Sequence, residues 1–278
     1  FGREYDELYD IGQLGGISVK GLSLLPRTGN PPSRIAETPS GMLNSVGLQN
    51  PGVESFIEND LPWLLTKDVA VIANITGTSV EQYVQMAERL ADTGVHLLEM
   101  NISCPNVHEG GVAFGVKPES VYAITKAVKA AAKQPLIVKL TPNVSDITEN
   151  ALAAEEAGAD AISMINTLTG IAVDVNKRRM VLANNTGGLS GPAVRPVALR
   201  MVWQSAKKVH IPIIGMGGIE TGEDAAAFML CGAKAVMVGT ANFTDPFACP
   251  RIIRELDAYC DRQKVQRAQE LVGTLAEY

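Results

Sequence analysis

The sequence predicts an α/β protein of the (β/α)8-barrel class, and three observations lead to this prediction. Short apolar runs rich in β-branched residues recur along the 278 residues, and most are followed by a turn and an amphipathic segment. Strands that alternate with helices in this way form parallel βα units. The composition agrees, because 46% of the residues are hydrophobic and many of the 26 glycines stand where a strand would meet a helix.

Seven segments have the pattern of a buried strand. We expect strands at residues 17–23, 69–75, 96–103, 136–141, 161–166, 211–216 and 235–239. The amphipathic segments predict helices at residues 80–92, 118–132, 145–157, 197–208 and 222–230. Capping residues are expected at several helix starts, namely Thr78 or Ser79, Ser145 and Thr221.

A closed barrel of this class needs eight strands. The chain begins with a helix-like segment at residues 3–8 and has no strand pattern before it. The simplest interpretation is that the first strand precedes residue 1 and is missing from this chain. Residues 1–278 would then form a single barrel domain that is incomplete at its N-terminus. The alternative is a genuine seven-stranded or doubly wound sheet.

Two stretches, residues 25–50 and 168–191, are too long and polar to be simple connections. Long loops that follow barrel strands are where active sites of this fold are built. The alternative is an ordinary surface excursion, but the Gly, Asn and Pro content favours defined turns.

The bulk properties exclude several classes of protein. The formal net charge is −6, and no Lys/Arg run is dense enough for a nucleic-acid or membrane surface. No apolar run approaches the roughly 20 residues of a transmembrane helix, and the polar first ten residues do not resemble a signal peptide. The four cysteines and three histidines have no metal-ligand spacing, so we expect free thiols in a reducing cytoplasm and no metal site.

The segment NISCPN, residues 101–106, ends one of the predicted strands. Pro105 cannot continue the ladder, which places Cys104 at the C-terminal lip of the strand between Asn101 and Asn106. Amides both donate and accept hydrogen bonds, so they can hold a polar ring, and a thiol can act as a general base if its pKa is lowered. The segment alone equally allows a small buried cysteine and asparagines that shape a turn.

Two glycine-bearing turns follow the last two predicted strands, Gly217-Gly218 and Gly239-Thr240. In a barrel these are the seventh and eighth strands, whose loops commonly bind phosphate through backbone N–H groups. Glycine lets the backbone approach such a group closely. Either pair alone could be a plain tight turn, but both occur in the expected order.

Two lysines lie within or at the ends of apolar strands, Lys20 and Lys139. A charged residue in such a strand rarely stays buried without a partner, and at a barrel lip an anionic cofactor or substrate is a natural one. The alternative is that each lysine reaches solvent. Polar residues also end two other strands, Asn74 and Asn166-Thr167.

The strings NISCPNVHEGGVAFG, VKLTPNV, MINTLTG, GGLSGPAVRPVALR, PIIGMGGIETGEDA and MVGTA together resemble dihydroorotate dehydrogenase. The upstream PRTGNPPSRIAETPSGMLNSVGLQNPG resembles the same family, so the resemblance covers essentially the whole chain. The NVHEGGVAFG loop is most similar to the class 1B catalytic subunit, whereas a membrane-bound class 2 enzyme would carry serine at position 104 and an extra N-terminal helix. One departure is that Leu22 and Ser23 stand where the family usually has two threonines.

The resemblance implies that the barrel binds FMN and oxidises dihydroorotate to orotate in pyrimidine biosynthesis. It implies that Cys104 removes a proton from C5 of the substrate while hydride leaves C6 for flavin N5. The implied FMN contacts are Lys20, Asn74, Asn101, Lys139, Ile165, Gly191, Gly217, Gly218, Gly239 and Thr240. The implied substrate contacts are Lys20, Asn44, Val46, Gly47, Leu48, Asn101, Asn106, Asn166 and Thr167.

The resemblance also implies a heterotetramer, in which a homodimer of this chain joins a subunit that carries FAD and a 2Fe-2S centre and passes electrons to NAD+. The chain has no cysteine cluster for an iron–sulfur centre, so that group would sit on the partner. The alternatives are a class 1A enzyme that reduces fumarate, a related flavin enzyme that acts on uracil-like rings, and a truncated chain that binds ligands without turnover.

Overall fold

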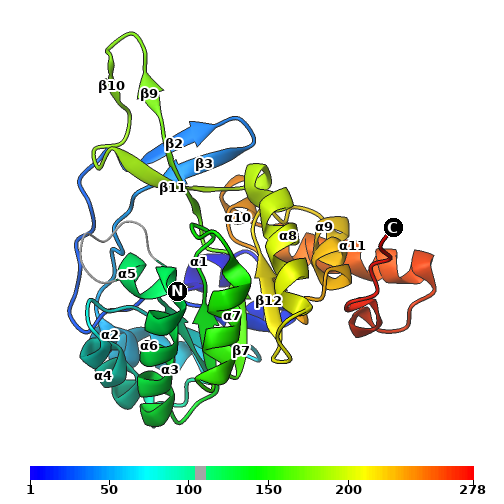
Figure 1. The fold of residues 1–278 in the computed structure, drawn as a ribbon, viewed down its shortest axis with the longest axis horizontal. Coiled ribbons are helices and arrows are strands. Elements are labelled where there is room, and N and C mark those ends of the chain that lie inside the picture. The colour runs from blue at the N-terminus through cyan, green and yellow to red at the C-terminus, as the bar shows by residue number, and fades with distance from the viewer. Residues whose placement is uncertain (104–110) are drawn as a thin grey trace.

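The computed structural model describes residues 1–103 and 111–278 (Figure 1). Its centre is a parallel sheet in which each strand pairs with the next along the chain. In order, the strands are β1 (Gly16–Ser18), β4 (Ala70–Ile75), β5 (Leu97–Asn101), β6 (Leu136–Lys139), β7 (Ala161–Met164), β12 (Ile213–Met216) and β13 (Ala235–Met237). All seven predicted strands are therefore confirmed.

The strand order excludes one of the folds that the sequence allowed. A doubly wound sheet reverses its strand order at a switch point, whereas this sheet runs in one direction from β1 to β13. The doubly wound alternative is therefore wrong, and the seven strands form a curled, barrel-like sheet. Several strands end before the predicted residue. Asn166 and Gly239, for example, lie in the loops that leave the sheet.

The five predicted helices are also confirmed: α4 (Val80–Leu90), α6 (Pro118–Ala131), α7 (Ile147–Glu156), α8 (Arg195–Ala206) and α9 (Gly222–Leu230). Ser79 caps α4, and Thr221 caps α9 in a capping box with Asp224. The prediction of Ser145 as a cap is wrong. Asp146 caps α7 instead, because its carboxylate accepts a hydrogen bond from Thr148 N at 2.8 Å and favours the positive end of the helix dipole.

The remaining elements are mostly short. The longest is α11 (Ala248–Gln263), which packs against α9. The others are α1 (Arg3–Asp6), η1 (Ile11–Gln13), α2 (Val53–Ser55), η2 (Phe56–Asp60), α3 (Leu61–Leu64), α5 (Gly111–Val116), η3 (Pro192–Val194), α10 (Ala241–Thr244) and η4 (Ala268–Leu271). None of the described helices is long and apolar enough to span a bilayer.

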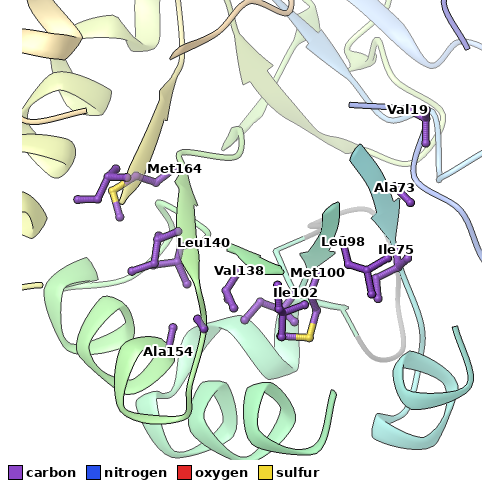
Figure 2. Packing of buried hydrophobic residues seen from close by; sticks show 14 of the residues in the cluster. Val19, Ala73, Ile75, Leu98, Met100, Ile102, Val138, Leu140, Ala154 and Met164 are labelled. Carbon is purple, nitrogen blue, oxygen red and sulfur yellow. The ribbon is translucent and has the colours of Figure 1, made fainter. Parts of the chain in front are cut away.

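Residues that alternate along a strand point to opposite faces of the sheet. One set packs under the helices and forms the hydrophobic core (Figure 2). It includes Val19, Ala73, Ile75, Leu98, Met100, Ile102, Val138, Leu140 and Met164, with Ala154 from α7. Burial of each large side chain stabilises the fold by roughly 1.5–3 kcal/mol. The other set includes polar residues such as Asn74, Glu99 and Ser163, and it faces the interior of the curled sheet.

The two long stretches form a second sheet, which the sequence did not predict. Strands β2 (Ile35–Thr38) and β3 (Gly41–Asn44) come from the first stretch, and β8 (Leu168–Ile171) and β11 (Thr186–Ser190) come from the second. They pair antiparallel in the order β2-β3-β11-β8, and a hairpin of β9 (Val173–Asp174) and β10 (Arg179–Met180) projects beyond them (Figure 1). Because β8 follows β7 after a short turn, this sheet lies at the carboxyl ends of the parallel strands.

The contact between α9 and α11 gives a stability prediction. A Cβ on Gly222 would overlap the carbonyl carbon of Glu255 and the nitrogen of Leu256. We expect Gly222→Ala to force the two helices apart and to lower the free energy of unfolding by about 1–3 kcal/mol. Urea unfolding followed by circular dichroism measures this change. Gly15→Ala is the control, since no described atom beyond its chain neighbours lies within 4 Å of its Cβ position; an equal loss of stability in both variants would contradict the prediction.

Candidate active site

The carboxyl ends of parallel strands meet at one edge of the sheet. In this structure that edge gathers Asn74 from β4, Asn101 from β5 and Lys139 from β6. Asn101 lies directly beside Lys139 in the pairing of β5 with β6. The loop after β7 adds Asn166. The structure therefore brings together the strand-end polar residues that the sequence singled out.

A buried carboxyl group, that of Glu99 on β5, lies beneath these residues. Its side chain is fully buried and accepts hydrogen bonds from Ser18 Oγ at 3.0 Å, Asn74 Nδ2 at 2.5 Å and Ser163 Oγ at 2.7 Å. Ser18 and Ser163 each lie two strands away from Glu99. Second-neighbour strands of a flat sheet are about 9.5 Å apart, so these contacts require the sheet to curl around Glu99.

Sequence analysis missed Glu99. The signal was present, because a glutamate stands inside the apolar run LLEMN. The argument that singled out Lys20 and Lys139, that a charged group in a strand needs a partner, applies equally to this residue.

Above Glu99, the asparagine side chains bond to one another. Asn101 Nδ2 donates to Asn74 Oδ1 at 3.4 Å, and Asn101 Oδ1 accepts from Ser103 Oγ at 2.9 Å and from Asn166 Nδ2 at 3.4 Å. Asn166 Nδ2 also donates to Ser103 Oγ at 2.7 Å. The Tyr83 hydroxyl donates to the backbone oxygen of Asn101 at 2.7 Å, which fixes the end of β5 from α4. The amides are thus held in one connected network.

The loop after β7 is held by a residue that the sequence did not single out. Asn166 Oδ1 accepts from Thr167 N at 2.7 Å. Asn143, in the loop after β6, donates to Thr167 O at 3.0 Å and accepts from Thr169 N at 3.0 Å. Asn143 therefore joins the start of the second sheet to the parallel sheet.

The expected substrate residues Asn44, Val46, Gly47 and Leu48 lie at and beyond the end of β3. Asn44 pairs with Gly188 of β11. Gly47 has a φ of +76°, and a Cβ there would lie 2.8 Å from Asn30 N, so only glycine fits without strain. Leu48 is also left-handed, with a φ of +56°. The loop has one defined shape, as expected for a binding loop.

Lys20 and Gly21 follow β1 and connect this loop to the parallel sheet. A Cβ on Gly21 would lie 3.0 Å from Asn74 Oδ1 and 3.4 Å from a methyl group of Leu48, so the chain next to Lys20 runs between Asn74 and Leu48.

Leu22 and Ser23, which stand where the family usually has two threonines, both have contacts that hold the chain after β1. Leu22 is fully buried and its N–H donates to Asn74 O at 2.8 Å, while Ser23 Oγ donates to Leu25 O at 2.8 Å.

The two glycine turns have the geometry of an anion cradle. Gly217 and Gly218 have φ values of +130° and +76°, and a Cβ on Gly218 would lie 2.7 Å from Gly191 O. No described atom lies within 4 Å of the Cβ position of Gly239, so its backbone is open to a ligand. Thr240 Oγ1 donates to Ser190 Oγ at 2.8 Å, which joins the second turn to β11.

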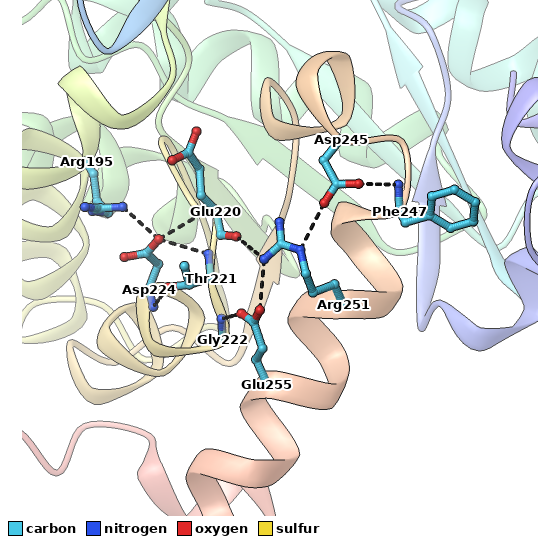
Figure 3. A network of polar contacts seen from close by, with 9 residues as sticks. All are labelled: Arg195, Glu220, Thr221, Gly222, Asp224, Asp245, Phe247, Arg251 and Glu255. Atoms are coloured by element: carbon cyan, nitrogen blue, oxygen red, sulfur yellow. Dashed lines mark hydrogen bonds and ion pairs between the residues drawn. The ribbon is translucent and has the colours of Figure 1, made fainter.

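A polar network braces the first of these turns from outside (Figure 3). Asp224 Oδ2 accepts from the N–H groups of Glu220 and Thr221, each at 3.0 Å, and pairs with the Arg195 guanidinium at 2.7 Å. Arg195 also donates to Gly218 O at 3.1 Å. The turn is therefore held in shape by the protein itself.

Arg251 of α11 links the segment after the first turn to Asp245 at the end of α10 (Figure 3). It donates to Glu220 O at 3.0 Å, to Glu255 Oε1 at 3.0 Å and to Asp245 Oδ2 at 2.9 Å. The Gly222 N–H and the Arg251 guanidinium hold the pKa of the Glu255 carboxyl below its usual value. The carboxylates of Glu255 and Asp245 raise the pKa of Arg251. The ion pairs are partly exposed, so their main effect is geometric.

These residues fit FMN. The open backbone at Gly239 and the turn at Gly217-Gly218 suit a phosphate, and the asparagines suit the polar edge of a flavin ring. The side chain of Lys139 is half-buried at the end of β6 beside Asn101, where its amine could meet an anionic ring. Ile165 is buried, and its side chain lies 3.5 Å from the Cβ position of Gly217.

Two expected site residues, Cys104 and Asn106, lie outside the described residues, so their roles remain predictions. The other three cysteines are free thiols, of which Cys231 and Cys249 are half-buried and Cys260 is buried. Burial raises the pKa of all three thiols.

A cavity of about 530 Å³ lies beside the start of α7. It is lined by residues such as Val116, Asn143, Asp146 and Glu149, and none of the expected FMN or substrate residues is among the described residues that line it.

Comparisons with known proteins agree with the geometry. A family model described as dihydroorotate dehydrogenase matches residues 1–259. The "Dihydroorotate dehydrogenase B (NAD(+)), catalytic subunit" of Alkaliphilus oremlandii is 57% identical over 274 residues, which cover 99% of this chain and 91% of that protein. The protein of the same name from Geobacillus kaustophilus is 53% identical over 98% of this chain and 88% of its own length. With this extent of similarity, the chain belongs to the dihydroorotate dehydrogenase family.

Proposed function

We propose that this chain is the catalytic subunit of an NAD+-linked dihydroorotate dehydrogenase, which oxidises dihydroorotate to orotate in pyrimidine biosynthesis. The observation that carries the proposal is the network of Asn74, Asn101 and Asn166 at the carboxyl edge of the sheet, beside Lys139 and two glycine turns. Uncharged amides suit a pyrimidine ring, whose own groups both donate and accept. The names of the relatives support the same reaction.

Cys104 is the proposed base. It would take the proton from C5 of dihydroorotate, while hydride leaves C6 for the flavin. Lys20 pairs with the carboxylate of the substrate, which a uracil-like ring lacks. The proposed substrate contacts are Lys20, Asn44, Val46, Gly47, Leu48, Asn101, Asn106, Asn166 and Thr167.

Bound FMN would supply the hydride acceptor. Its proposed contacts are Lys20, Asn74, Asn101, Lys139, Ile165, Gly191, Gly217, Gly218, Gly239 and Thr240. The turns at Gly217-Gly218 and Gly239-Thr240 bind the phosphate through backbone N–H groups. Lys139 would place a positive charge near the electron-rich edge of the bound ring, where a cation favours reduction.

The electrons leave through a partner. The relatives are named as catalytic subunits, and the described cysteines are scattered rather than clustered. We propose that a partner subunit would carry FAD and a 2Fe-2S centre and pass electrons to NAD+, and that a homodimer of this chain with two such partners would form a heterotetramer. The scattered thiols also suit a reducing cytoplasm.

The first prediction of this proposal is spectroscopic. The purified protein should bind FMN and be yellow, and dihydroorotate should bleach the flavin absorbance without oxygen. Dihydrouracil is the matched control, because it lacks the carboxylate that pairs with Lys20. Equal bleaching by both compounds would favour the enzyme class that acts on uracil-like rings, and bleaching by neither would contradict the proposed reaction.

The second prediction concerns the base. Cys104→Ala should slow flavin reduction by dihydroorotate on the order of 10²–10⁴-fold, because general-base catalysis is lost, while FMN binding is retained. Rapid-mixing absorbance without oxygen measures this rate. Cys231→Ala is the control, since its thiol is half-buried at the end of α9, and it should reduce flavin at the wild-type rate. Reduction by Cys104→Ala at that same rate across neutral pH would refute the assignment.

The third prediction concerns Lys139. Lys139→Met should shift the midpoint potential of bound FMN to a more negative value, because the cation that stabilises the reduced anion is lost. A dye-equilibration titration measures the potential. Lys133→Met is the matched control, because Lys133 is exposed and pairs with Asp92 at 2.8 Å on the surface. A potential that is unchanged in Lys139→Met would place this lysine away from the flavin.

A further inference from the structure

We propose that Glu99 is a positioning residue that fixes which end of each site amide donates and which end accepts a hydrogen bond. The proposal rests on the proposed function, because it is the binding of FMN and substrate that would use these amides. Glu99 is not among the residues that we expect to contact FMN or the substrate. It acts through Asn74, whose Nδ2 lies 2.5 Å from Glu99 Oε2.

An asparagine side chain can turn its amide by half a rotation with almost no change in shape, which exchanges its donor and its acceptor. A site that binds ligands through such amides therefore needs a contact that holds each amide in one of its two orientations. The oxygens of Glu99 already accept hydrogen bonds from Ser18 and Ser163. They present an acceptor to Asn74, so the NH₂ end of Asn74 must face Glu99 and its carbonyl end must face the site.

The direction passes along the network from one amide to the next. Asn74 Oδ1 can only accept, so it takes Nδ2 of Asn101 at 3.4 Å. Asn101 Oδ1 then points away from Asn74 and accepts hydrogen bonds from Ser103 Oγ at 2.9 Å and from Asn166 Nδ2 at 3.4 Å. In each of these hydrogen bonds, the donor is the residue farther along the network from Glu99 and the acceptor is the residue nearer to it. A reversed Asn74 would face Glu99 with its oxygen and leave two acceptors in contact inside a dry interior, which is costly.

The burial of Glu99 makes this control effective. Its side chain is fully buried, and the sheet curls so that β1, β4 and β7 all supply its donors. Water cannot replace these partners. The amides are thus set before any ligand arrives, which reduces the reorganisation that binding requires.

The arrangement separates the role of the acceptor from the role of the charge. A glutamine at position 99 can keep an oxygen at the place of Oε2, facing Asn74 and Ser18, and turn its NH₂ to Ser163 Oγ, which can also accept. Glu99→Gln therefore preserves the direction of the amides although the negative charge is lost. Glu99→Met has nearly the same length and removes the acceptor.

The experiment measures FMN affinity by flavin fluorescence and orotate affinity by the change in the flavin spectrum. Glu99→Gln should keep both dissociation constants within about threefold of the wild type. Glu99→Met should weaken both on the order of ten- to a hundredfold. Wild-type affinities in Glu99→Met would overturn the proposal. So would losses of equal size in the two variants, because the charge would then be the cause.

An exchange of the two residues tests the same contact if Glu99→Met does not fold. Asn74→Asp alone places two carboxyl groups at a 2.5 Å contact and should weaken FMN binding. When it is combined with Glu99→Gln, the glutamine NH₂ can donate to the new carboxylate at position 74, whose second oxygen still accepts from Asn101. The double variant should bind FMN more tightly than Asn74→Asp alone. Affinity no better than that of the single variant would overturn the proposal.

A measurement without ligand separates this inference from the proposed function. In the ligand-free protein, Glu99→Met should speed the exchange of the side-chain amide protons of Asn101, whereas Glu99→Gln should leave it slow. The amide of Asn143 is the control, because it bonds to Thr141 and Thr167 outside the chain of amides. Unchanged exchange at Asn101, or equal acceleration at Asn143, would overturn the positioning role. A wild-type protein that binds neither FMN nor orotate would instead contradict the proposed function alone.

Discussion

The structure depends on a hydrogen-bonded carboxyl group at the centre of a curled parallel sheet. Glu99 joins β5 to β1, β4 and β7, and two of its three partners lie two strands away. A flat sheet could not make these contacts. The curl that allows them also turns the polar faces of the strands toward one another, while the apolar faces remain under the helices. The same geometry therefore produces both the hydrophobic core and the polar interior.

The site is assembled from segments that are far apart in the chain. The second sheet pairs β3 with β11, which brings the loop after Asn44 to the same edge as Asn166 and Thr240. The backbone of the first glycine turn is braced by Arg195 of α8 and Arg251 of α11, and the second turn is joined to β11 by Thr240. Both turns are thus supported by side-chain hydrogen bonds within the protein, which is the arrangement expected of a site that is organised before binding.

Much of the fold could be predicted from the sequence, because strands, amphipathic helices and glycine turns are local patterns. The second sheet could not, since β2, β3, β8 and β11 are short and lie in polar stretches, and their pairing joins distant parts of the chain. Glu99 could have been singled out as a charged residue inside an apolar strand, but its partners could not be predicted, because Ser18 and Ser163 lie two strands away and reach it only in a curled sheet. The amides of Asn74, Asn101 and Asn166 were expected at the site, but the direction of their hydrogen bonds depends on contacts between strands.

A crystal structure of the protein with FMN and orotate tests the central claim most directly, that the carboxyl edge of the sheet above Glu99 is one preorganised flavin and substrate site. The account predicts the FMN phosphate at Gly217-Gly218 and Gly239-Thr240, orotate between Asn44 and Asn166, and unchanged hydrogen bonds from Glu99 to Asn74. Ligand density elsewhere, for example in the cavity beside Asp146 and Glu149, or an Asn74 side chain that turns away from Glu99 on binding, would contradict it.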